Sequence, residues 1–105
     1  MAQYDVYKNP SLAQREAYPY MVDIQNDIFG NYVTRLVMPL QRFKTVPSSL
    51  PRRLQTPLAI DGEALYLAPH LCAAFPIRAL GKTVTQVAQQ QALIVDALDA
   101  VVSGV

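Results

Sequence analysis

The sequence predicts a mainly β domain with one C-terminal helix, in which a small barrel-like antiparallel sheet carries the helix on one side. Short runs of alternating apolar and polar residues recur as far as residue 80, with most of the eight prolines between them. Beyond about residue 83 the apolar residues recur at helical spacing instead. A chain of 105 residues can hold one hydrophobic core without metal or disulfide support, so residues 1–105 are expected to form a single domain.

The first two strands are predicted at Tyr4–Tyr7 and at residues 20–25, with a polar loop between them. Side chains of the second strand alternate between two faces, one with Tyr20, Val22 and Ile24, the other with Asp23 and Gln25. This alternation predicts one buried face and one face in water. Asp23, like Asp27 beyond it, is therefore expected to be exposed.

A third strand is predicted over residues 33–38, after a turn at Gly30-Asn31. Pro39 cannot donate a hydrogen bond to a neighbouring strand, so it is expected to end this strand or to place it at a sheet edge. Residues 40–55 are typical of a long surface loop, because prolines and serines are mixed there with basic residues.

The remaining elements are a hairpin, a short strand and the helix. Asp61-Gly62 is a strong turn signal between strands predicted at residues 56–60 and 64–67. Residues 76–80 are the last predicted strand, and a helix of about twenty residues is expected to begin near Thr83 or Thr85, either of which can cap it. The expected core stripe of this helix is Val84, Val87, Ala88, Ile94, Leu98 and Val101.

The composition favours self-association and gives no general affinity for nucleic acid. Apolar residues make up 51% of the chain and charged residues 16%, which is more apolar surface than one small core hides. The net charge of +1 argues against a general nucleic-acid-binding role. Basic residues nevertheless gather between residues 28 and 60, where no acidic residue occurs. This run predicts either a loop kept soluble by its charges or a surface that faces an anionic partner.

The sequence offers poor material for catalysis or for a metal site. His70 and Cys72 are the lone histidine and cysteine, and two ligands without nearby carboxylates predict no metal or cofactor. Asp61 and Glu63 flank a turn glycine, which favours a role in the turn over paired acid–base chemistry. A single cysteine, no leader-like start and no stretch long enough to span a bilayer predict a cytoplasmic protein without membrane contact. Binding is the better hypothesis.

Four segments, in this order, carry a specific resemblance. They are YDVYKN at residues 4–9, VDIQND and RLVMPL within residues 22–40, the run Cys72-Ala73-Ala74-Phe75-Pro76, and a helix ending in Ser103-Gly104-Val105. Together they resemble the CcdB toxins, which poison DNA gyrase in toxin–antitoxin modules of bacteria. The resemblance implies an SH3-like barrel of the CcdB/Kid/MazF type and a homodimer formed across the C-terminal helices.

The resemblance further implies that the toxin dimer binds the gyrase A subunit and traps the gyrase–DNA cleavage complex. Such a toxin is not an enzyme and does not bind nucleic acid directly. The family residues that contact gyrase correspond to Ile28, Phe29, Asp99, Val102, Ser103, Gly104 and Val105. The residues expected at the dimer interface are Ala97, Val101 and Val105.

A CcdA-like antitoxin with an acidic, disordered tail is the other partner that the resemblance implies. Basic residues of the polar loop after the first strand and of the long loop after the third strand are expected to meet this tail. These residues are Lys8, Arg15, Arg42, Lys44, Arg52 and Arg53.

Two alternatives stay open at this point. Well-studied members have Trp where Ser103 stands, which leaves open a homologue with weak or lost gyrase poisoning, in which Phe29 restores part of the apolar contact. The other alternative is a messenger-RNA-cleaving ribonuclease toxin of the MazF or Kid type, because those enzymes share the fold. That activity requires arginines around a groove with Asp61, and the candidates are Arg35, Arg42, Arg52 and Arg53.

Overall fold

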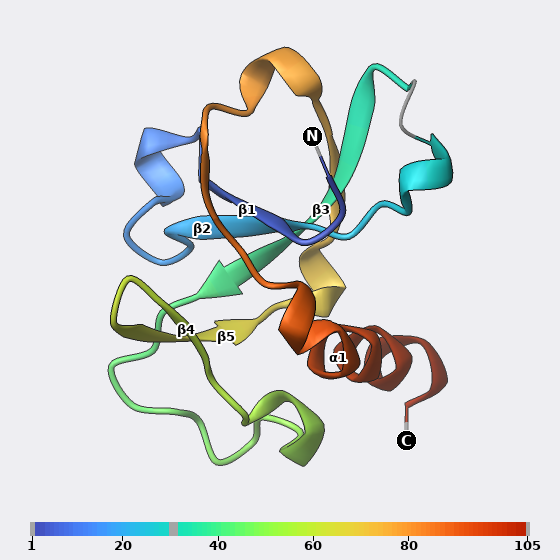
Figure 1. The fold of residues 1–105 in the computed structure, drawn as a ribbon. Helices are drawn as coiled ribbons and strands as arrows, with labels where there is room; N and C mark the ends of the chain where they lie inside the picture. Colours follow the sequence, from blue (N-terminus) through green and yellow to red (C-terminus); the bar gives the residue numbers. More distant parts are fainter. Residues whose placement is uncertain (1, 30–31, 105) are drawn as a thin grey trace.

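The computed structural model describes residues 2–29 and 32–104, in which seven strands and one α-helix occur (Figure 1). The strands are β1 (Asp5–Lys8), β2 (Tyr20–Asp23), β3 (Thr34–Gln41), β4 (Leu58–Ile60), β5 (Glu63–Leu67), β6 (Ala73–Pro76) and β7 (Thr83–Gln86), and the helix is α1 (Gln91–Ser103). The strands pair in the order β4-β5-β3-β2-β1-β7, with β6 also paired to β3. This sheet curls into a nearly closed barrel with α1 packed against it. The predicted mainly β fold with a C-terminal helix is thus confirmed.

The eight-residue strand β3 is central to the sheet because three other strands pair with it. Strand β2 runs along one side, while β6 and then β5 occupy the other side. Pro39 lies inside β3, so the prediction that it ends the strand or marks an edge is wrong. Its carbonyl oxygen accepts the backbone N–H of Ala68 at 3.0 Å, on the side where β6 gives way to β5. The missing N–H of Pro39 points to that same side, so no regular ladder hydrogen bond is lost there.

Both faces of the sheet contribute residues to a buried core. On the face toward α1, one layer of the larger core runs across β1, β2 and β3 and consists of Val6, Val22 and Met38. The opposite face has a smaller core made of Tyr7, Met21, Val37 and Leu80, with Phe75 packed against it. The barrel therefore lacks the fully water-exposed face that simple alternation predicts.

Burial of the second face changes the environment of its charged residues. Asp23 lies on the opposite face from Val22, as alternation predicts, but its side chain is fully buried, so its predicted exposure is wrong. Arg35, which the sequence places in a basic surface run, is buried beside it. Both are inside because the chain around Phe75 and Leu80 covers this face. Asp27 is exposed, as expected.

The β4–β5 hairpin confirms the predicted turn. Ile60 pairs with Glu63, so Asp61 and Gly62 alone form the loop. Both residues have a positive φ, 50° for Asp61 and 79° for Gly62. This is the backbone of a two-residue type I′ turn, and it explains the glycine at the second position.

The last part of the chain departs from the prediction in two places. Residues 76–80 do not form a separate strand, because β6 ends at Pro76 and a 3₁₀ turn follows over Ile77–Ala79. Residues 83–86 form β7, which pairs with β1, and do not begin the helix. The β-branched side chains of Thr83, Val84 and Thr85 favour a strand, and the open side of β1 supplies the backbone partners. The helix therefore begins at Gln91 and has 13 residues.

Candidate functional site

Two of the places where large apolar side chains are exposed include residues that the family resemblance selects. The first is the link between β2 and β3, where Ile28, Tyr32 and Val33 are 81%, 60% and 80% exposed. The second is the end of α1, where Val101 and Val102 are 44% and 83% exposed. Soluble monomers rarely gather such residues in water without a binding role. The sequence pattern does not single out Tyr32 and Val33, because Val33 continues the alternation of β3 and is taken for a strand residue.

Residues 25–29, called the contact turn below, are held to the barrel by a buried ion pair. The Arg35 side chain donates from Nε to Oδ2 of Asp23 at 2.6 Å and from Nη2 to Oδ1 at 3.0 Å. The two side chains are 1% and 0% exposed. Nη2 also donates to the carbonyl oxygen of Gln25 at 3.0 Å and lies 3.6 Å from Oδ1 of Asp27. One guanidinium thus joins the barrel interior to two residues of the contact turn.

The charge of Asp23 depends on its partner Arg35. Burial raises the pKa of Asp23, and the hydrogen bond from Arg35 opposes that rise. The guanidinium of Arg35 is charged in any case, and the hydrogen bond to Asp23 raises its pKa further. A buried charge that loses its partner is costly, whereas the planar fork of arginine matches a carboxylate with two parallel hydrogen bonds. The buried pair therefore has a fixed geometry, and Arg35 attaches the contact turn to it through Gln25.

Further hydrogen bonds set the path of the contact turn. Oε1 of Gln25 accepts the backbone N–H of Leu36 at 2.9 Å, and Oδ1 of Asn26 accepts that of Ile28 at 2.9 Å. Oδ1 of Asp27 accepts the backbone N–H of Gln3 at 2.9 Å, which ties the turn to the N-terminal segment. Phe29 closes the 3₁₀ turn Asp27–Phe29. Polar side chains thus hold the turn while the side chain of Ile28 remains in water.

The end of α1 presents the other residues that the family resemblance selects. Gly104 has a φ of 73° and donates its N–H to the carbonyl oxygen of Ala100 at 3.0 Å, so it is the C-cap of the helix. A positive φ favours glycine at this position. The exposed Ser103 donates its hydroxyl to the carbonyl oxygen of Asp99 at 2.7 Å. Val105 lies outside the described residues.

Arg53 binds two carboxylates on α1. Its Nη2 lies 2.5 Å from Oδ1 of Asp96 and 3.2 Å from Oδ2 of Asp99. The hydrogen bond from Arg53 lowers the pKa of Asp96. Arg53, selected as an antitoxin contact, is therefore paired with Asp99, selected as a gyrase contact. This ion pair joins the long loop after β3 to the helix.

Arg42 is also paired within the chain. Its guanidinium binds the carboxylate of Glu63 through Nε and Nη2, with Nη2 at 2.9 Å from Oε1. Nη1 donates to the carbonyl oxygen of Glu16 at 2.9 Å. The hydrogen bond from Arg42 lowers the pKa of Glu63. Arg42 and Arg53 thus have acidic partners already, whereas Lys44 and Arg52 are exposed on the long loop.

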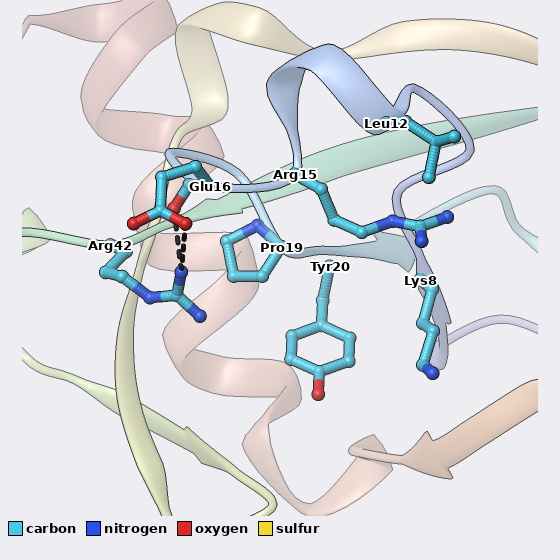
Figure 2. Close-up of a pocket in the computed structure, with 7 residues that line it drawn as sticks. All are labelled: Lys8, Leu12, Arg15, Glu16, Pro19, Tyr20 and Arg42. Carbon is cyan, nitrogen blue, oxygen red and sulfur yellow. Dashed lines mark hydrogen bonds and ion pairs between the residues drawn. The ribbon is translucent and has the colours of Figure 1, made fainter.

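A basic groove lies between the loop after β1 and the end of β3 (Figure 2). Its cavity of about 410 Å³ is lined by Lys8, Leu12, Arg15, Glu16, Pro19, Tyr20 and Arg42. In Figure 2, Lys8 and Arg15 lie on the side of Tyr20 away from Arg42. A second cavity of about 490 Å³ shares Lys8 and Arg15 and extends to Lys82.

The basic groove and the second cavity, which share Lys8 and Arg15, together hold three cations that have no carboxylate partner within residues 2–29 and 32–104; they are called the groove cations below. Lys8 and Lys82 form no ion pair with these residues. Arg15 donates from Nε to the carbonyl oxygen of Asn9 at 2.8 Å and forms no ion pair with them either. Lys82 joins Lys8 and Arg15 because β7 pairs with β1. Lys82 is not predictable as a groove residue from the sequence, whose pattern places residue 82 next to a helix and not beside β1.

Three of the four arginines that a ribonuclease would need are already paired with carboxylates. Arg35 is buried with Asp23, Arg42 binds Glu63, and Arg53 binds Asp96. Asp61 lies in the hairpin turn, where its Oδ2 accepts the hydroxyl of Tyr20 at 3.4 Å. In the described part of the chain, no group of three His, Cys, Asp or Glu side chains could hold a metal ion. This arrangement does not favour the ribonuclease alternative.

The helix residues expected at a dimer interface have different environments. Ala97 is fully buried in the core of its own chain, so it has no surface left for a second chain and we remove it from the expected interface. Val101 lies one turn further along the same side and is 44% exposed. Val105 lies outside the described residues. The apolar stripe of α1 thus extends past the core of its own barrel at Val101.

Comparison with known proteins identifies a family for this arrangement. A family model described as CcdB protein matches residues 3–104, which include the contact turn, the basic groove and all of α1. No curated protein sequence matches the chain. No helix among the described residues is long and apolar enough to cross a membrane.

Proposed function

The chain belongs to the CcdB family of toxins from toxin–antitoxin modules, and we propose that it binds the gyrase A subunit and traps the complex of gyrase with cleaved DNA. In this proposal a toxin dimer enters the cavity of the gyrase A dimer, so that double-strand breaks persist. The toxin acts in the bacterial cytoplasm, where gyrase works, and catalyses no reaction itself. The observation that carries the proposal is the exposure of Ile28 and Val102, which correspond to family gyrase contacts and which the barrel core does not need.

The gyrase-binding surface consists of the contact turn and the end of α1. Both parts present aliphatic side chains on a backbone held by hydrogen bonds, through Asp27 and Asn26 in the turn and through the Gly104 cap on the helix. Such a backbone loses little conformational freedom on binding, which favours affinity. Tyr32 and Val33 extend the exposed apolar area next to the turn.

Ser103 in place of the family Trp weakens gyrase binding in this proposal without abolishing it. Loss of an aromatic anchor at an interface costs about 2–4 kcal/mol, or roughly thirtyfold to a thousandfold in affinity. The Ser103 hydroxyl donates back to the Asp99 carbonyl, so it brings no unsatisfied donor to the interface. Ile28 and Val102 keep their apolar area for the contact.

A homodimer through the ends of α1 is part of the same proposal. The helix continues its buried stripe beyond Ile94 and Ala97 to the half-exposed Val101, which its own barrel does not cover. A second copy of the same helix presents the same residue across a two-fold axis, as closed dimers require. We retain Val101 and Val105 as the helix residues of this interface.

A CcdA-like antitoxin is proposed to place its acidic tail in the basic groove. Lys8 and Arg15, both selected from sequence, have no carboxylate partner there among the described residues, and Lys82 of the adjoining cavity is a third such cation. Lys44 and Arg52 are exposed on the long loop and extend the basic surface. Arg42 and Arg53 contribute less to the attraction, because Glu63, Asp96 and Asp99 offset their charge.

The proposal is tested by inducible expression in two bacterial strains, one with ordinary gyrase A and one with a gyrase A variant that resists CcdB toxins. We expect growth arrest in the first strain only, and accumulation of linear DNA when purified toxin is added to gyrase. Ile28→Ser should abolish both effects, whereas Leu12→Ser, which alters an equally exposed aliphatic residue outside the proposed surface, should abolish neither. Toxicity that persists in the resistant strain would refute gyrase as the target and would favour a ribonuclease.

A further inference from the structure

We propose that Arg35 is a positioning residue, which holds the contact turn in the geometry that presents Ile28 to gyrase. The inference rests on the proposed gyrase-binding function. Arg35 does not touch the partner, because its side chain is 1% exposed. It acts through Gln25 and Asp27, both of which belong to the turn.

The guanidinium has two kinds of partner. Toward the interior it makes the two parallel hydrogen bonds to Asp23, at 2.6 and 3.0 Å. Toward the surface its Nη2 donates to the Gln25 carbonyl at 3.0 Å and lies 3.6 Å from the Asp27 carboxylate. Ile28 belongs to neither core cluster, so these polar contacts take the place of packing around it.

Stability alone gives a weak reason for a charged pair at this depth. Removing two charges from water costs free energy that their attraction often only balances, and an apolar pair of similar volume would stabilise the barrel about as well. An arginine fork does supply direction, because its donors lie in one plane at fixed angles. Here the donors are directed at the Gln25 carbonyl and the Asp27 carboxylate, and these two residues lie just before Ile28 in the chain.

Ile28 depends on this support more than a core residue does. Its side chain is 81% exposed, so packing within the chain does not fix its place. Its backbone N–H is held only locally, by Oδ1 of Asn26 at 2.9 Å. A turn that is already ordered loses less conformational freedom on binding, so its order contributes directly to affinity.

Arg35→Lys tests the inference, because lysine keeps the charge beside Asp23 but cannot form the fork. We expect amide hydrogen exchange to increase about tenfold at residues 26–28, with little change within α1. Arg78→Lys, at an exposed arginine on the 3₁₀ turn after β6, is the matched control and should leave both regions unchanged. Unchanged exchange in the contact turn of Arg35→Lys would overturn the inference.

A second measurement separates positioning from general stability. Arg35→Lys should weaken binding to the gyrase A dimerisation region about tenfold, and it should have almost no further effect once Ile28→Ala is present, because the two changes act on one contact. Additive losses would overturn the inference. If wild-type protein does not bind gyrase A at all, the proposed function fails, while the exchange experiment still decides whether Arg35 orders the turn.

Asp27→Ala keeps the inference testable should Arg35→Lys fail to fold. The Asp27 side chain is 64% exposed, so its loss leaves the buried pair intact. It removes the acceptor for the Gln3 N–H and the outer contact of Arg35. We expect exchange at residues 26–28 to rise severalfold without a change within α1. Exchange equal to that of the wild type would overturn the inference.

Discussion

The two ends of helix α1 should respond to the same kind of substitution in opposite ways. Ile94 is 1% exposed and belongs to the larger core, whereas Val102, eight residues later, is 83% exposed. Ile94→Ala should therefore destabilise the fold, and Val102→Ala should weaken gyrase binding without destabilising it. Val95→Ala, at a half-exposed position near the start of the helix, is the control for both.

The structure sets the size of these effects. Truncating a fully buried isoleucine to alanine typically costs about 2–5 kcal/mol, which lowers the midpoint of thermal unfolding by roughly 10–25 °C in a domain of this size. Truncating an exposed valine changes stability by less than about 0.5 kcal/mol. If gyrase covers Val102, the loss of its two methyl groups removes about 1.6 kcal/mol of binding free energy, or roughly fifteenfold in affinity.

Thermal unfolding and calorimetry against the gyrase A dimerisation region measure the two quantities on the same samples. At a temperature well below its own transition, Ile94→Ala should bind gyrase A as the wild type does. A midpoint for Val102→Ala as low as that of Ile94→Ala would mean that Val102 is packed in the folded chain. Wild-type affinity for Val102→Ala would remove the end of α1 from the interface.

Three further predictions follow from the charges and the exposed stripe. Val101→Asp should convert a dimer to a monomer in sedimentation at micromolar concentration, and a dimer that persists would place the interface elsewhere. Because Arg42 lowers the pKa of Glu63, the stability from this pair is present above about pH 4.5 and is lost as the pH falls further. The difference in thermal midpoint between wild type and Arg42→Met should therefore shrink from pH 6 to pH 3, and a constant difference would refute the charge effect. Serine substitutions of the groove cations Lys8, Arg15 and Lys82 should slow association with an acidic peptide and reduce the salt dependence of its rate. Lys44→Ser should have a smaller effect on both quantities.

Local turn and strand signals were enough to predict most of the barrel. The Asp61-Gly62 hairpin follows from two residues that tolerate a positive φ, and the first three strands follow from alternation. Prediction failed for Pro39 because a proline fits inside β3 only at the point where its partner changes from β6 to β5. The position of that change is set by the assembled sheet and not by the residues around Pro39. It failed for residues 83–86 because their partner, β1, lies near the other end of the chain.

The candidate surfaces were predicted in part, for a related reason. Ile28 and Val102, which the resemblance selects as contact residues, are both exposed. Ile28 follows the end of β2, and Val102 lies in the last turn of α1. The environments of Asp23 and Arg35 were not predictable, because alternation does not show that both faces of the sheet are covered. Lys82 was missed because its neighbours in space come from another strand pair.

The ion pairs also change which charges a partner can use. A count along the sequence places Arg42 and Arg53 in one basic run, but in the folded chain each neutralises a carboxylate. Arg53 in addition holds Asp99, on the face of α1 assigned to gyrase, so a substitution there alters both proposed surfaces at once. The groove cations, which have no carboxylate partner in the described residues, change the attraction of an acidic tail without disturbing an ion pair to α1. Substitutions that are meant to separate antitoxin binding from gyrase binding therefore belong in the groove and not in the long loop after β3.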